Sequence, residues 1–395
     1  MSIDRHSHIL EIEHLNVSFV QYEKGLRQID LPVITDLSVS VHPGEIVAVV
    51  GSSGSGKSLL AHAVLGLLPS NADVSAEIRF NDKRIGAEEI KALRGREISL
   101  VPQSTTFLDP LLKVGPGVRR CDNGEEAKKR QRKLFERFHL KPETEKLYPF
   151  ELSGGMARRV LLSSALMEDP KLIIADEPTP GLDLELAKKA LADFRTFADQ
   201  GNGVLLITHD IELALEVADR IAVFYAGTTV EEAPVADFRQ EETLRHPYSR
   251  ALWRAMPQNG FRSLRGAQPY VKDMPKGCPF APRCEMADEE CGGEIPLRVV
   301  RGGTVRCIKA KADMEGHHHG DGPWHTHGAG SDHHHHGDVT HHHRHGEEQH
   351  HHHGDVIHHH RHGEEQHHHH GDMTHHHRHG EEHHHHREEA PHHDS

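Results

Sequence analysis

The stretch EIVAVVGSSGSGKSLLAHAVLGLL, residues 45–68, decides the fold of this 395-residue chain. It starts with a β-branched run at residues 45–50, continues through a loop of glycine and serine, and ends in an apolar segment typical of a helix. A strand, a glycine loop and a helix in this order are the context that a phosphate-binding P-loop requires. A Gly/Ser turn that matches by chance is the alternative. We therefore predict an α/β protein with a nucleotide site at this loop.

The loop supplies groups that can hold phosphate. Its glycines let backbone N–H groups point inward around a β-phosphate, and the helix that follows contributes a favourable dipole. Lys57 adds a positive charge, and the Ser58 hydroxyl can bind Mg²⁺. The predicted nucleotide-binding residues of this segment are Gly51, Ser52, Gly54, Ser55, Gly56, Lys57, Ser58 and Leu59.

Two further apolar segments end in residues suited to the same chemistry. KLIIADEP, residues 171–178, carries Asp176 and Glu177 where a parallel sheet would have its carboxyl edge, the ligand-binding edge of such folds. Asp176 can hold Mg²⁺, and Glu177 can orient and deprotonate an attacking water. GVLLITHD, residues 203–210, places His209 at the same edge, within reach of a γ-phosphate. The alternatives are a solvated turn for the acids and a capping or packing role for the histidine.

Between these motifs lies ELSGGMARRV, residues 151–160, which indicates the family. LSGGM followed by a basic helix, upstream of LIIADEP, resembles the signature loop of ATP-binding-cassette ATPases. Gln103 in SLVPQS resembles the Q-loop of that family, Asp183 in PGLD its D-loop, and His209 its switch histidine. The resemblance covers residues 9–230 and implies a P-loop NTPase fold with a mixed sheet core and a helical subdomain.

The same resemblance implies a mechanism. Two such domains close head to tail on two ATP molecules, so that Ser153 and Gly155 of one domain reach the γ-phosphate held by Lys57 of the other. Bare backbone N–H groups at a helix start suit this contact. The adenine ring is expected on Tyr22, with Phe19 as the alternative, although a core position would also explain Phe19. The expected Mg²⁺ ligands are Ser58, Gln103 and Asp176, the expected catalytic residues are Glu177, His209 and Gln103, and Asp183 is expected to contribute to nucleotide binding.

Two features resemble one subfamily, the importers of dipeptides, oligopeptides and nickel. Met156 replaces the more widespread Gln after LSGG, and HPYSRALWRAMP, residues 246–257, resembles the C-terminal extension of these ATPases. Residues 103–153 are shorter than usual, so an unusual membrane partner is expected to dock there. Further departures, at positions not needed for ATP chemistry, are Ala157, Pro180 and Gly181.

The extension also contains a cluster of cysteines. Four cysteines in a short segment suggest thiolate ligation of zinc or an iron–sulfur cluster, and some relatives with this extension are thought to hold a 4Fe–4S cluster. The spacing matches neither zinc ribbons nor ferredoxins, so reduced structural thiols are the alternative. Cys121 is predicted to be incidental, and five cysteines in all indicate a reducing compartment. The four candidate ligands are Cys278, Cys284, Cys291 and Cys307.

The last part of the chain is a histidine-rich repeat. Of 43 histidines, 35 lie from His317 onward, and similar blocks start at His333, His350 and His367 with a period of 17 residues. We expect residues 312–395 to be disordered, because a segment without apolar side chains cannot offset its chain entropy. Neutral imidazoles are expected to bind Ni²⁺ and Zn²⁺ weakly, and a low-complexity expansion without a role is the alternative. Representative tail ligands are His333, His334, His341, His350, His358, His367 and His375.

Composition and charge restrict the partners. Residues 312–395 carry 4 Lys and Arg against 16 Asp and Glu, so most of the net charge of −14 lies there. The nearly neutral remainder gives no support to a nucleic-acid partner. No apolar run approaches the roughly 20 residues of a membrane span, and the N-terminus lacks the features of a secretory signal. The predicted domains are a nucleotide-binding domain at 1–240 with its helical subdomain at about 104–160, a C-terminal extension at 241–311, and the tail at 312–395.

These expectations combine into one functional hypothesis. The chain is expected to be the ATP-hydrolysing subunit of an importer of nickel or a nickel chelate, with the tail as a metal buffer. The alternative is the same subunit in di- or oligopeptide uptake; a soluble ATPase of ribosomes or DNA, or a metallochaperone with a decayed ATPase, are weaker hypotheses. The expected partners are two integral membrane permeases, a second, non-identical ATPase subunit and an extracellular solute-binding protein, at the cytoplasmic face of the cell (inner) membrane.

Overall fold

The structure, a computed structural model, describes residues 7–22, 27–311 and six short segments between residues 332 and 378. The chain divides into two compact units, Met1–Glu315 and Gly316–Ser395. The first unit contains every residue that the sequence predicts for the ATP site. The second contains the histidine-rich repeats.

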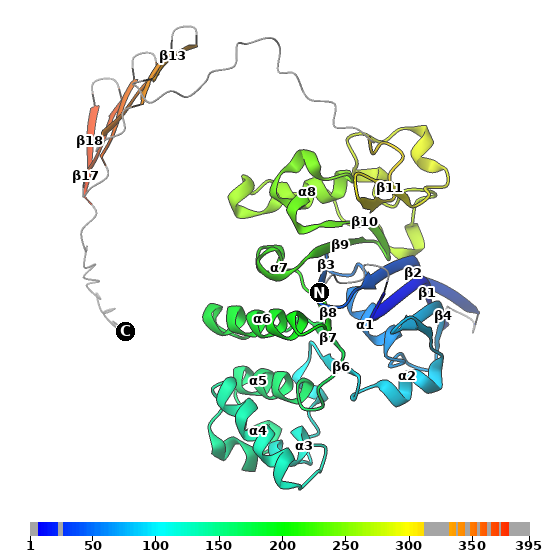
Figure 1. The fold of residues 1–395 in the computed structure, drawn as a ribbon. Coiled ribbons are helices and arrows are strands. Elements are labelled where there is room, and N and C mark those ends of the chain that lie inside the picture. The colour runs from blue at the N-terminus through cyan, green and yellow to red at the C-terminus, as the bar shows by residue number, and fades with distance from the viewer. Residues whose placement is uncertain are drawn as a thin grey trace, which may run out of the picture. The chain divides into compact units, whose positions relative to one another are not determined.

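An eight-stranded sheet forms the centre of the first unit, in the order β11-β12-β10-β9-β3-β8-β7-β6 (Figure 1). The strands from β9 to β6 run parallel, whereas β10, β12 and β11 are antiparallel to their neighbours. Every residue of β3, β7 and β8 is buried, as expected for parallel strands that are covered on both faces. This mixed sheet confirms the predicted fold class. The strands are β3 (Ile46–Gly51), β6 (Ile98–Val101), β7 (Leu172–Asp176), β8 (Gly203–Ile207), β9 (Arg220–Tyr225), β10 (Thr228–Pro234), β11 (Arg298–Val300) and β12 (Gly303–Val305).

A second, antiparallel sheet has the order β2-β1-β4-β5. Buried residues alternate along β1, including Leu10 and Ile12, so one face of this sheet packs inward. They share a hydrophobic cluster with Leu60 and Val64 of α1 and with Val47 of the central sheet. Helix α1 is therefore held between the two sheets. The elements are β1 (Leu10–Tyr22), β2 (Gln28–Val41), β4 (Ala72–Phe80), β5 (Lys83–Arg84), α1 (Lys57–Val64) and α2 (Ala87–Leu93).

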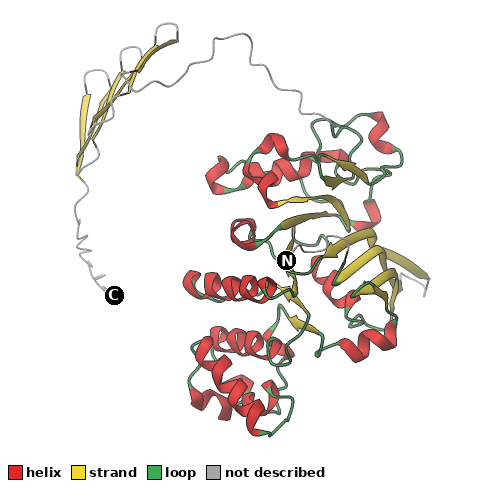
Figure 2. Ribbon diagram, viewed as in Figure 1, coloured by secondary structure: helices red, strands yellow, loops and turns green. Residues whose placement is uncertain are grey.

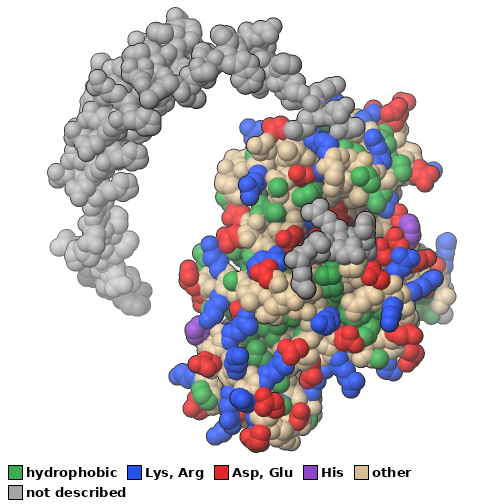
Figure 3. All heavy atoms as spheres, viewed as in Figure 1, with side chains coloured by type: hydrophobic (Ala, Val, Ile, Leu, Met, Phe, Trp, Pro, Cys, Tyr) green, Lys and Arg blue, Asp and Glu red, His purple; other side chains and the backbone are tan. Residues whose placement is uncertain are grey.

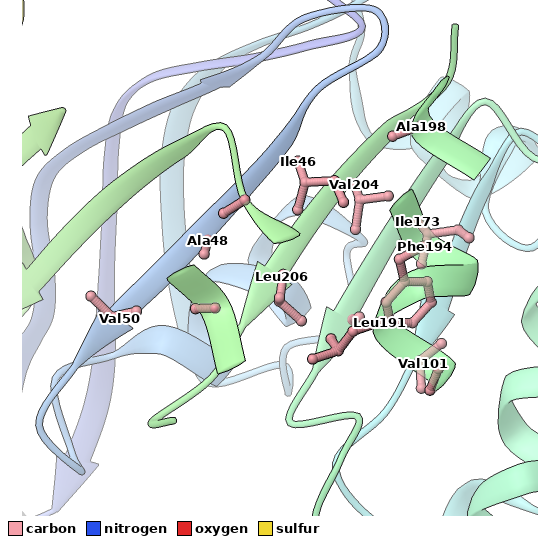
Figure 4. Packing of buried hydrophobic residues seen from close by; sticks show 14 of the residues in the cluster. Ile46, Ala48, Val50, Val101, Ile173, Leu191, Phe194, Ala198, Val204 and Leu206 are labelled. Carbon is pink, nitrogen blue, oxygen red and sulfur yellow. The ribbon is translucent and has the colours of Figure 1, made fainter. Parts of the chain in front are cut away.

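Helix α6 covers the other face of the central sheet. Its buried residues Leu191, Phe194 and Ala198 recur at helical spacing, which turns one apolar stripe toward the strands. In Figure 4 the side chains of Leu191 and Phe194 lie near Ile173 of β7 and Val101 of β6, and Ala198 lies farther along the helix. Burial of each large apolar side chain stabilises the fold by about 1.5–3 kcal/mol. The helices that follow β7 and β8 are α6 (Leu184–Asp199) and α7 (Ile211–Val217).

A helical subdomain is inserted between β6 and β7, as the family resemblance implies (Figure 1). In α4 the buried face carries Leu134 and Phe135, while the other faces are charged. The buried Arg119 at the end of α3 donates to Gln131 of α4 and joins the two helices. The elements are η1 (Thr105–Phe107), α3 (Val114–Val118), α4 (Glu125–Arg137), η2 (Pro142–Lys146), η3 (Pro149–Glu151) and α5 (Gly154–Ala165).

Between β10 and residue 311 the chain has little regular structure: α8, several 3-10 turns and the β11–β12 hairpin (Figure 2). The β11–β12 hairpin pairs with β10, so the end of the first unit continues the ATPase sheet. Of the described residues, none lies in a helix long and apolar enough to cross a membrane. The elements are η4 (Val235–Arg239), η5 (Glu241–Thr243), α8 (Pro247–Ala255), η6 (Pro257–Asn259), η7 (Val271–Asp273), η8 (Ala281–Arg283) and η9 (Glu289–Gly292).

In the second unit the structure describes six antiparallel strands in chain order. Strands β14, β16 and β18 begin at Val339, Val356 and Met373, so they repeat with the 17-residue period of the sequence. The predicted disorder of residues 312–395 stays a prediction, because backbone pairing alone buries no apolar surface that could offset the chain entropy. The rest of the tail lies outside the described residues. The strands are β13 (Asp332–His336), β14 (Val339–His343), β15 (Glu348–His353), β16 (Val356–Arg361), β17 (Glu365–His370) and β18 (Met373–Arg378).

Candidate nucleotide-binding site

The P-loop connects β3 to α1, and its backbone depends on glycine at two points. Gly51 has a φ of +153°, and a Cβ there would lie 2.1 Å from the carbonyl oxygen of Phe224 on β9. Gly56 directly precedes α1 with a φ of +97°, in a left-handed conformation that glycine adopts without a steric cost. These glycines let the chain pass from a buried strand to a helix in one tight loop, which presents the N–H groups of the helix start to a phosphate.

Lys57, the first residue of α1, is buried within this loop. Its Nζ donates to the carbonyl oxygens of Gly51 at 2.9 Å and Ser52 at 3.0 Å. Burial lowers the pKa of Lys57, and the carboxylates of Glu177 and Asp176 oppose that effect. The structure thus brings the predicted phosphate-binding cation and the two predicted acids into one electrostatic group.

Ser58 and Asp176 come from different elements and meet directly. The Ser58 hydroxyl donates to Asp176 Oδ1 at 3.1 Å, and Asp176 is the last residue of β7. Burial raises the pKa of Asp176, while the hydrogen bond from Ser58 and the charge of Lys57 act in the opposite direction. Hydroxyl and carboxylate oxygens are hard ligands of the kind that Mg²⁺ prefers. These two residues therefore fit the Mg²⁺ role predicted for them.

Glu177 and His209 form a pair at the ends of β7 and β8. His209 Nδ1 lies 2.7 Å from Glu177 Oε2, and the Glu177 carboxylate is buried while the imidazole is exposed. Glu177 has a φ of +49°, a left-handed conformation that is unusual for a residue with a side chain. Strained backbone of this kind concentrates at functional sites. The arrangement is that of a general base oriented by a second group.

Gln103 follows β6 with an exposed side chain, and a residue that the sequence did not single out fixes its backbone. The guanidinium of Arg158, on α5, donates to the carbonyl oxygens of Pro102 at 2.6 Å and Gln103 at 2.5 Å. Burial lowers the pKa of Arg158, and Asp176 and Glu177 oppose this. Arg158 thus links the signature helix to the Q-loop. Only its position in a basic helix after LSGG could have indicated this role.

The predicted signature and D-loop residues lie at helix starts. The exposed Ser153 caps α5, its hydroxyl accepting a hydrogen bond from the Met156 N–H at 3.2 Å. Asp183 caps α6 in the same way, accepting from the Leu186 N–H at 2.9 Å. Gly155 lies against the Gly181 carbonyl, 3.3 Å from where its Cβ would be. The contact of Gly155 with Gly181 brings the predicted signature loop and the predicted D-loop side by side.

The two aromatic candidates for adenine differ in exposure. Tyr22 is 65% exposed at the end of β1, and its hydroxyl accepts a hydrogen bond from Gln28 Nε2 at 2.8 Å. Phe19 packs against the core beneath the antiparallel sheet. The exposed ring of Tyr22 is available to a base, so Tyr22 stays our prediction.

The four cysteines of the extension surround one small cavity. Cys278, Cys284, Cys291 and Cys307 line it together with Phe280 and His246, and its volume is about 10 Å³. Burial raises the pKa of the Cys278 thiol to about 11 and also raises the pKa values of Cys284 and Cys307. Nowhere in residues 7–22 and 27–311 are three or more His, Cys, Asp or Glu side chains arranged to hold a metal ion. The predicted tail ligands lie in β13–β18, whose side chains are outside the described structure; they are His333, His334, His341, His350, His358, His367 and His375.

Comparison with known proteins agrees with this geometry. The family model described as "ABC transporter" matches residues 34–180, and "Oligopeptide/dipeptide transporter, C-terminal region" matches residues 230–291. The chain is 33% identical over 330 residues to the oligopeptide transport ATP-binding protein OppD of Salmonella typhimurium, covering 78% of this chain and 95% of that protein. It is 35% identical over 308 residues to the dipeptide transport ATP-binding protein DppD of Escherichia coli, covering 73% and 92%.

A solved structure shares the fold of the first unit. It is a dimeric, post-hydrolysis state of the ATP-binding cassette MJ0796 bound to ADP and Pi, 26% identical, with a TM-score of 0.50 over 57% of this chain and 98% of that one. The fold and the paired acids at the P-loop thus define an ATP-hydrolysing P-loop cassette. The chain belongs to the ATP-binding subunits of ABC transporters, and within them to the oligopeptide and dipeptide importer type. The predicted ATPase activity is confirmed, and ATP and Mg²⁺ follow as its cofactors.

Proposed function

We propose that this chain powers the uptake of dipeptides or oligopeptides. The observation that carries the proposal is the match of residues 230–291 to the C-terminal region of peptide transporters, because this region lies beyond the ATPase core common to ABC transporters. Relatives named for oligopeptide and dipeptide transport support the same cargo. The finding favours the peptide alternative over nickel, which the histidine tail had suggested as the first choice.

The hydrolytic step falls to the pair at the ends of β7 and β8. Glu177 accepts a proton from the attacking water, and His209, 2.7 Å from its carboxylate, holds that carboxylate in position. Lys57 and the N–H groups at the start of α1 would bind the phosphates, and Ser58 and Asp176 would hold Mg²⁺, which would supply positive charge against the phosphate oxygens. Gln103 completes this set from the end of β6, where Arg158 fixes its backbone.

The signature residues act on a second cassette. Ser153 is exposed at the N-terminus of α5, where bare N–H groups and the helix dipole attract a phosphate. We infer that Ser153 and Gly155 close on the γ-phosphate held by the partner cassette, and that Asp183 contacts the same interface. The partner is a second, non-identical ATPase subunit, since importers of this type usually pair two different ones.

The helical subdomain offers a surface for the membrane subunits. Four large apolar side chains there are exposed: Leu111 at 84%, Phe150 at 75%, Phe107 at 52% and Leu112 at 37%. These side chains come from η1, from the loop that follows it and from η3, and large exposed apolar side chains are a feature of surfaces that bind other proteins. We infer that two permeases dock there, that a solute-binding protein completes the complex outside, and that the chain lies at the cytoplasmic face of the cell membrane. Figure 3 shows acidic and basic side chains interspersed over the visible face of the first unit, which gives no support to nucleic acid.

A metal at the cysteine cavity stays a prediction. The four thiols converge and supply the sulfur donors that zinc and iron–sulfur clusters use. A cavity of about 10 Å³ holds at most about one water molecule, so the arrangement does not fit a 4Fe–4S cluster. Burial raises the pKa of the Cys278 thiol to about 11, and a bound metal ion would lower it again, because coordination deprotonates a thiol. Iron and zinc analysis of the full chain, purified without oxygen, tests the prediction.

The proposed cargo is tested by uptake in a strain that lacks this chain. Labelled di- and oligopeptides should no longer enter, while uptake of radiolabelled nickel should be unchanged. Complementation with the Glu177→Gln variant is the matched control, because it supplies a folded chain without the proposed base. Unchanged peptide uptake together with lost nickel uptake would refute the proposal in favour of nickel.

A further inference from the structure

The P-loop is bound from outside by the C-terminal extension. The backbone N–H of Ser52 donates to the hydroxyl of Tyr248 at 2.9 Å, and the Ser52 hydroxyl donates to Gln268 Oε1 at 2.8 Å. The amide of Gln268 donates in turn to the carbonyl oxygen of Gly54 at 3.3 Å. Three polar groups in the first half of the phosphate loop are therefore held by two residues that lie beyond the ATPase core.

Tyr248 is placed by a buried anchor. The carboxylate of Glu231, on β10, accepts hydrogen bonds from the backbone N–H groups of Arg245 at 2.8 Å and His246 at 2.7 Å. It also pairs with the Arg245 guanidinium at 3.3 Å, and both side chains are almost completely buried. Pro247 then starts α8, where His246 Nδ1 accepts from the Tyr248 N–H at 3.0 Å. The HPY motif thus has a structural purpose: it fixes the start of the helix that carries Tyr248.

The ring of Tyr248 is fixed as firmly as its hydroxyl. It packs against Tyr225 with ring centroids 4.5 Å apart and against Phe280 at 5.3 Å, and all three side chains are buried. Phe280 lines the cavity of the four cysteines, so a continuous row of aromatic side chains joins that cavity to the phosphate loop. The hydroxyl of Tyr225 accepts from Arg283 at 3.2 Å and forms no hydrogen bond with the P-loop.

We propose that Tyr248 and Gln268 are positioning residues for ATP. A loop rich in glycine loses much conformational entropy when it is ordered around a phosphate. Two fixed side chains that hold Ser52 and Gly54 reduce that loss before nucleotide arrives, because the loop is already curved. The remaining N–H groups of the loop and of α1 then meet the phosphates without rearrangement. This inference rests on ATP binding at the P-loop and holds whichever solute is transported.

Tyr248→Phe tests the inference, because it removes the hydroxyl and keeps the ring in its row. The full-length chain, purified with its membrane partners, should show a KM for ATP raised about two- to tenfold, with kcat nearly unchanged at saturating ATP. Binding of a fluorescent ATP analogue to the full chain alone should weaken by a similar factor. Tyr225→Phe is the matched control: it removes a buried hydroxyl from the same row without touching the loop, and should leave the KM unchanged.

Gln268→Ala provides a second, independent variant. Gln268 is partly exposed in a loop, so its loss does not threaten folding, and it should raise the KM in the same direction as Tyr248→Phe. An unchanged KM in both variants would overturn the proposal, as would an equal rise in Tyr225→Phe. If kcat falls instead of KM rising, the hydroxyl acts on the fold or on turnover and the positioning role is wrong. If these variants lose peptide uptake but bind ATP with normal affinity, the positioning role of Tyr248 and Gln268 is wrong. The proposed function in peptide uptake would still hold.

Discussion

Acidification should destabilise the first unit through His246. This imidazole is completely buried beside Phe280, and burial, assisted by the charge of Arg250, lowers its pKa from 6.5 to about 3. Because the folded-state pKa is the lower one, the unfolded chain binds the proton more readily, and stability is lost as pH falls below 6.5. At pH 5 the solution is about 1.5 pH units below the unfolded-state pKa, so the free energy of unfolding should be about 2 kcal/mol lower than at pH 7. The loss should continue until pH reaches the folded-state value of about 3.

His246→Asn isolates this effect. Asparagine is a good N-cap residue and can accept from the Tyr248 N–H in place of the imidazole, but it does not titrate in this range. Urea unfolding of the full chain, followed by tryptophan fluorescence at pH 7 and pH 5, gives the loss of stability for each protein. Wild type should lose about 2 kcal/mol more than the variant between these pH values. The tail histidines are the same in both proteins, so their effect on the stability change cancels in the comparison.

His14→Asn is the control with the opposite sign. His14 is exposed, and its hydrogen bond and ion pair with Asp36 raise its pKa, so its protonation stabilises the fold as pH falls. Its removal should make the protein more acid-sensitive, not less. If wild type and His246→Asn lose equal stability between pH 7 and pH 5, the buried imidazole either is hydrated or titrates normally, and the reasoning is refuted.

Three further predictions concern the ATP site and the tail. Glu177→Gln should lower ATP turnover by about 10²–10⁴-fold while ATP binding is retained, since only the proton acceptor is lost; normal turnover measured by phosphate release would contradict the assignment. Gly51→Ala should abolish ATP binding, measured with a fluorescent analogue, because its Cβ would lie 2.1 Å from the Phe224 carbonyl oxygen. Gly117→Ala is the control, because a Cβ there meets no atom within 4 Å and Gly117 has no positive φ; it should leave ATP binding unchanged. Removal of residues 316–395 should leave ATP binding unchanged and should abolish the weak Ni²⁺ binding that we expect calorimetry to detect in the full chain. In the full chain this Ni²⁺ binding should decline below about pH 6, as the imidazoles become protonated.

The ATP site could be predicted because its chemistry is concentrated in short motifs. Lys57 and Ser58 are neighbours in the chain, and Asp176 and Glu177 follow one buried strand, so local context sufficed. The contacts of Tyr248 and Gln268 with Ser52 could not be predicted, because each joins distant parts of the chain. The separations in sequence are 196 positions for Tyr248 and 216 positions for Gln268. Arg158 was missed for a similar reason: a basic residue in a helix is usually exposed, and only the packing shows that this one is buried.

The cargo was the least predictable property. The histidine repeats drew attention to nickel because imidazole is a good ligand for that ion. The extension that follows the ATPase core carried better information, since it matches the peptide transporters over residues 230–291.

The anchor at Glu231 means that the cassette cannot be trimmed to a minimal enzyme. A chain cut after residue 240 would lack Arg245 and His246. The buried carboxylate of Glu231 would then have lost the guanidinium and the two backbone N–H groups that pair with it. It would also expose the inner edge of β10 where the β11–β12 hairpin now pairs. Any fragment built to study this ATPase must therefore run through residue 311.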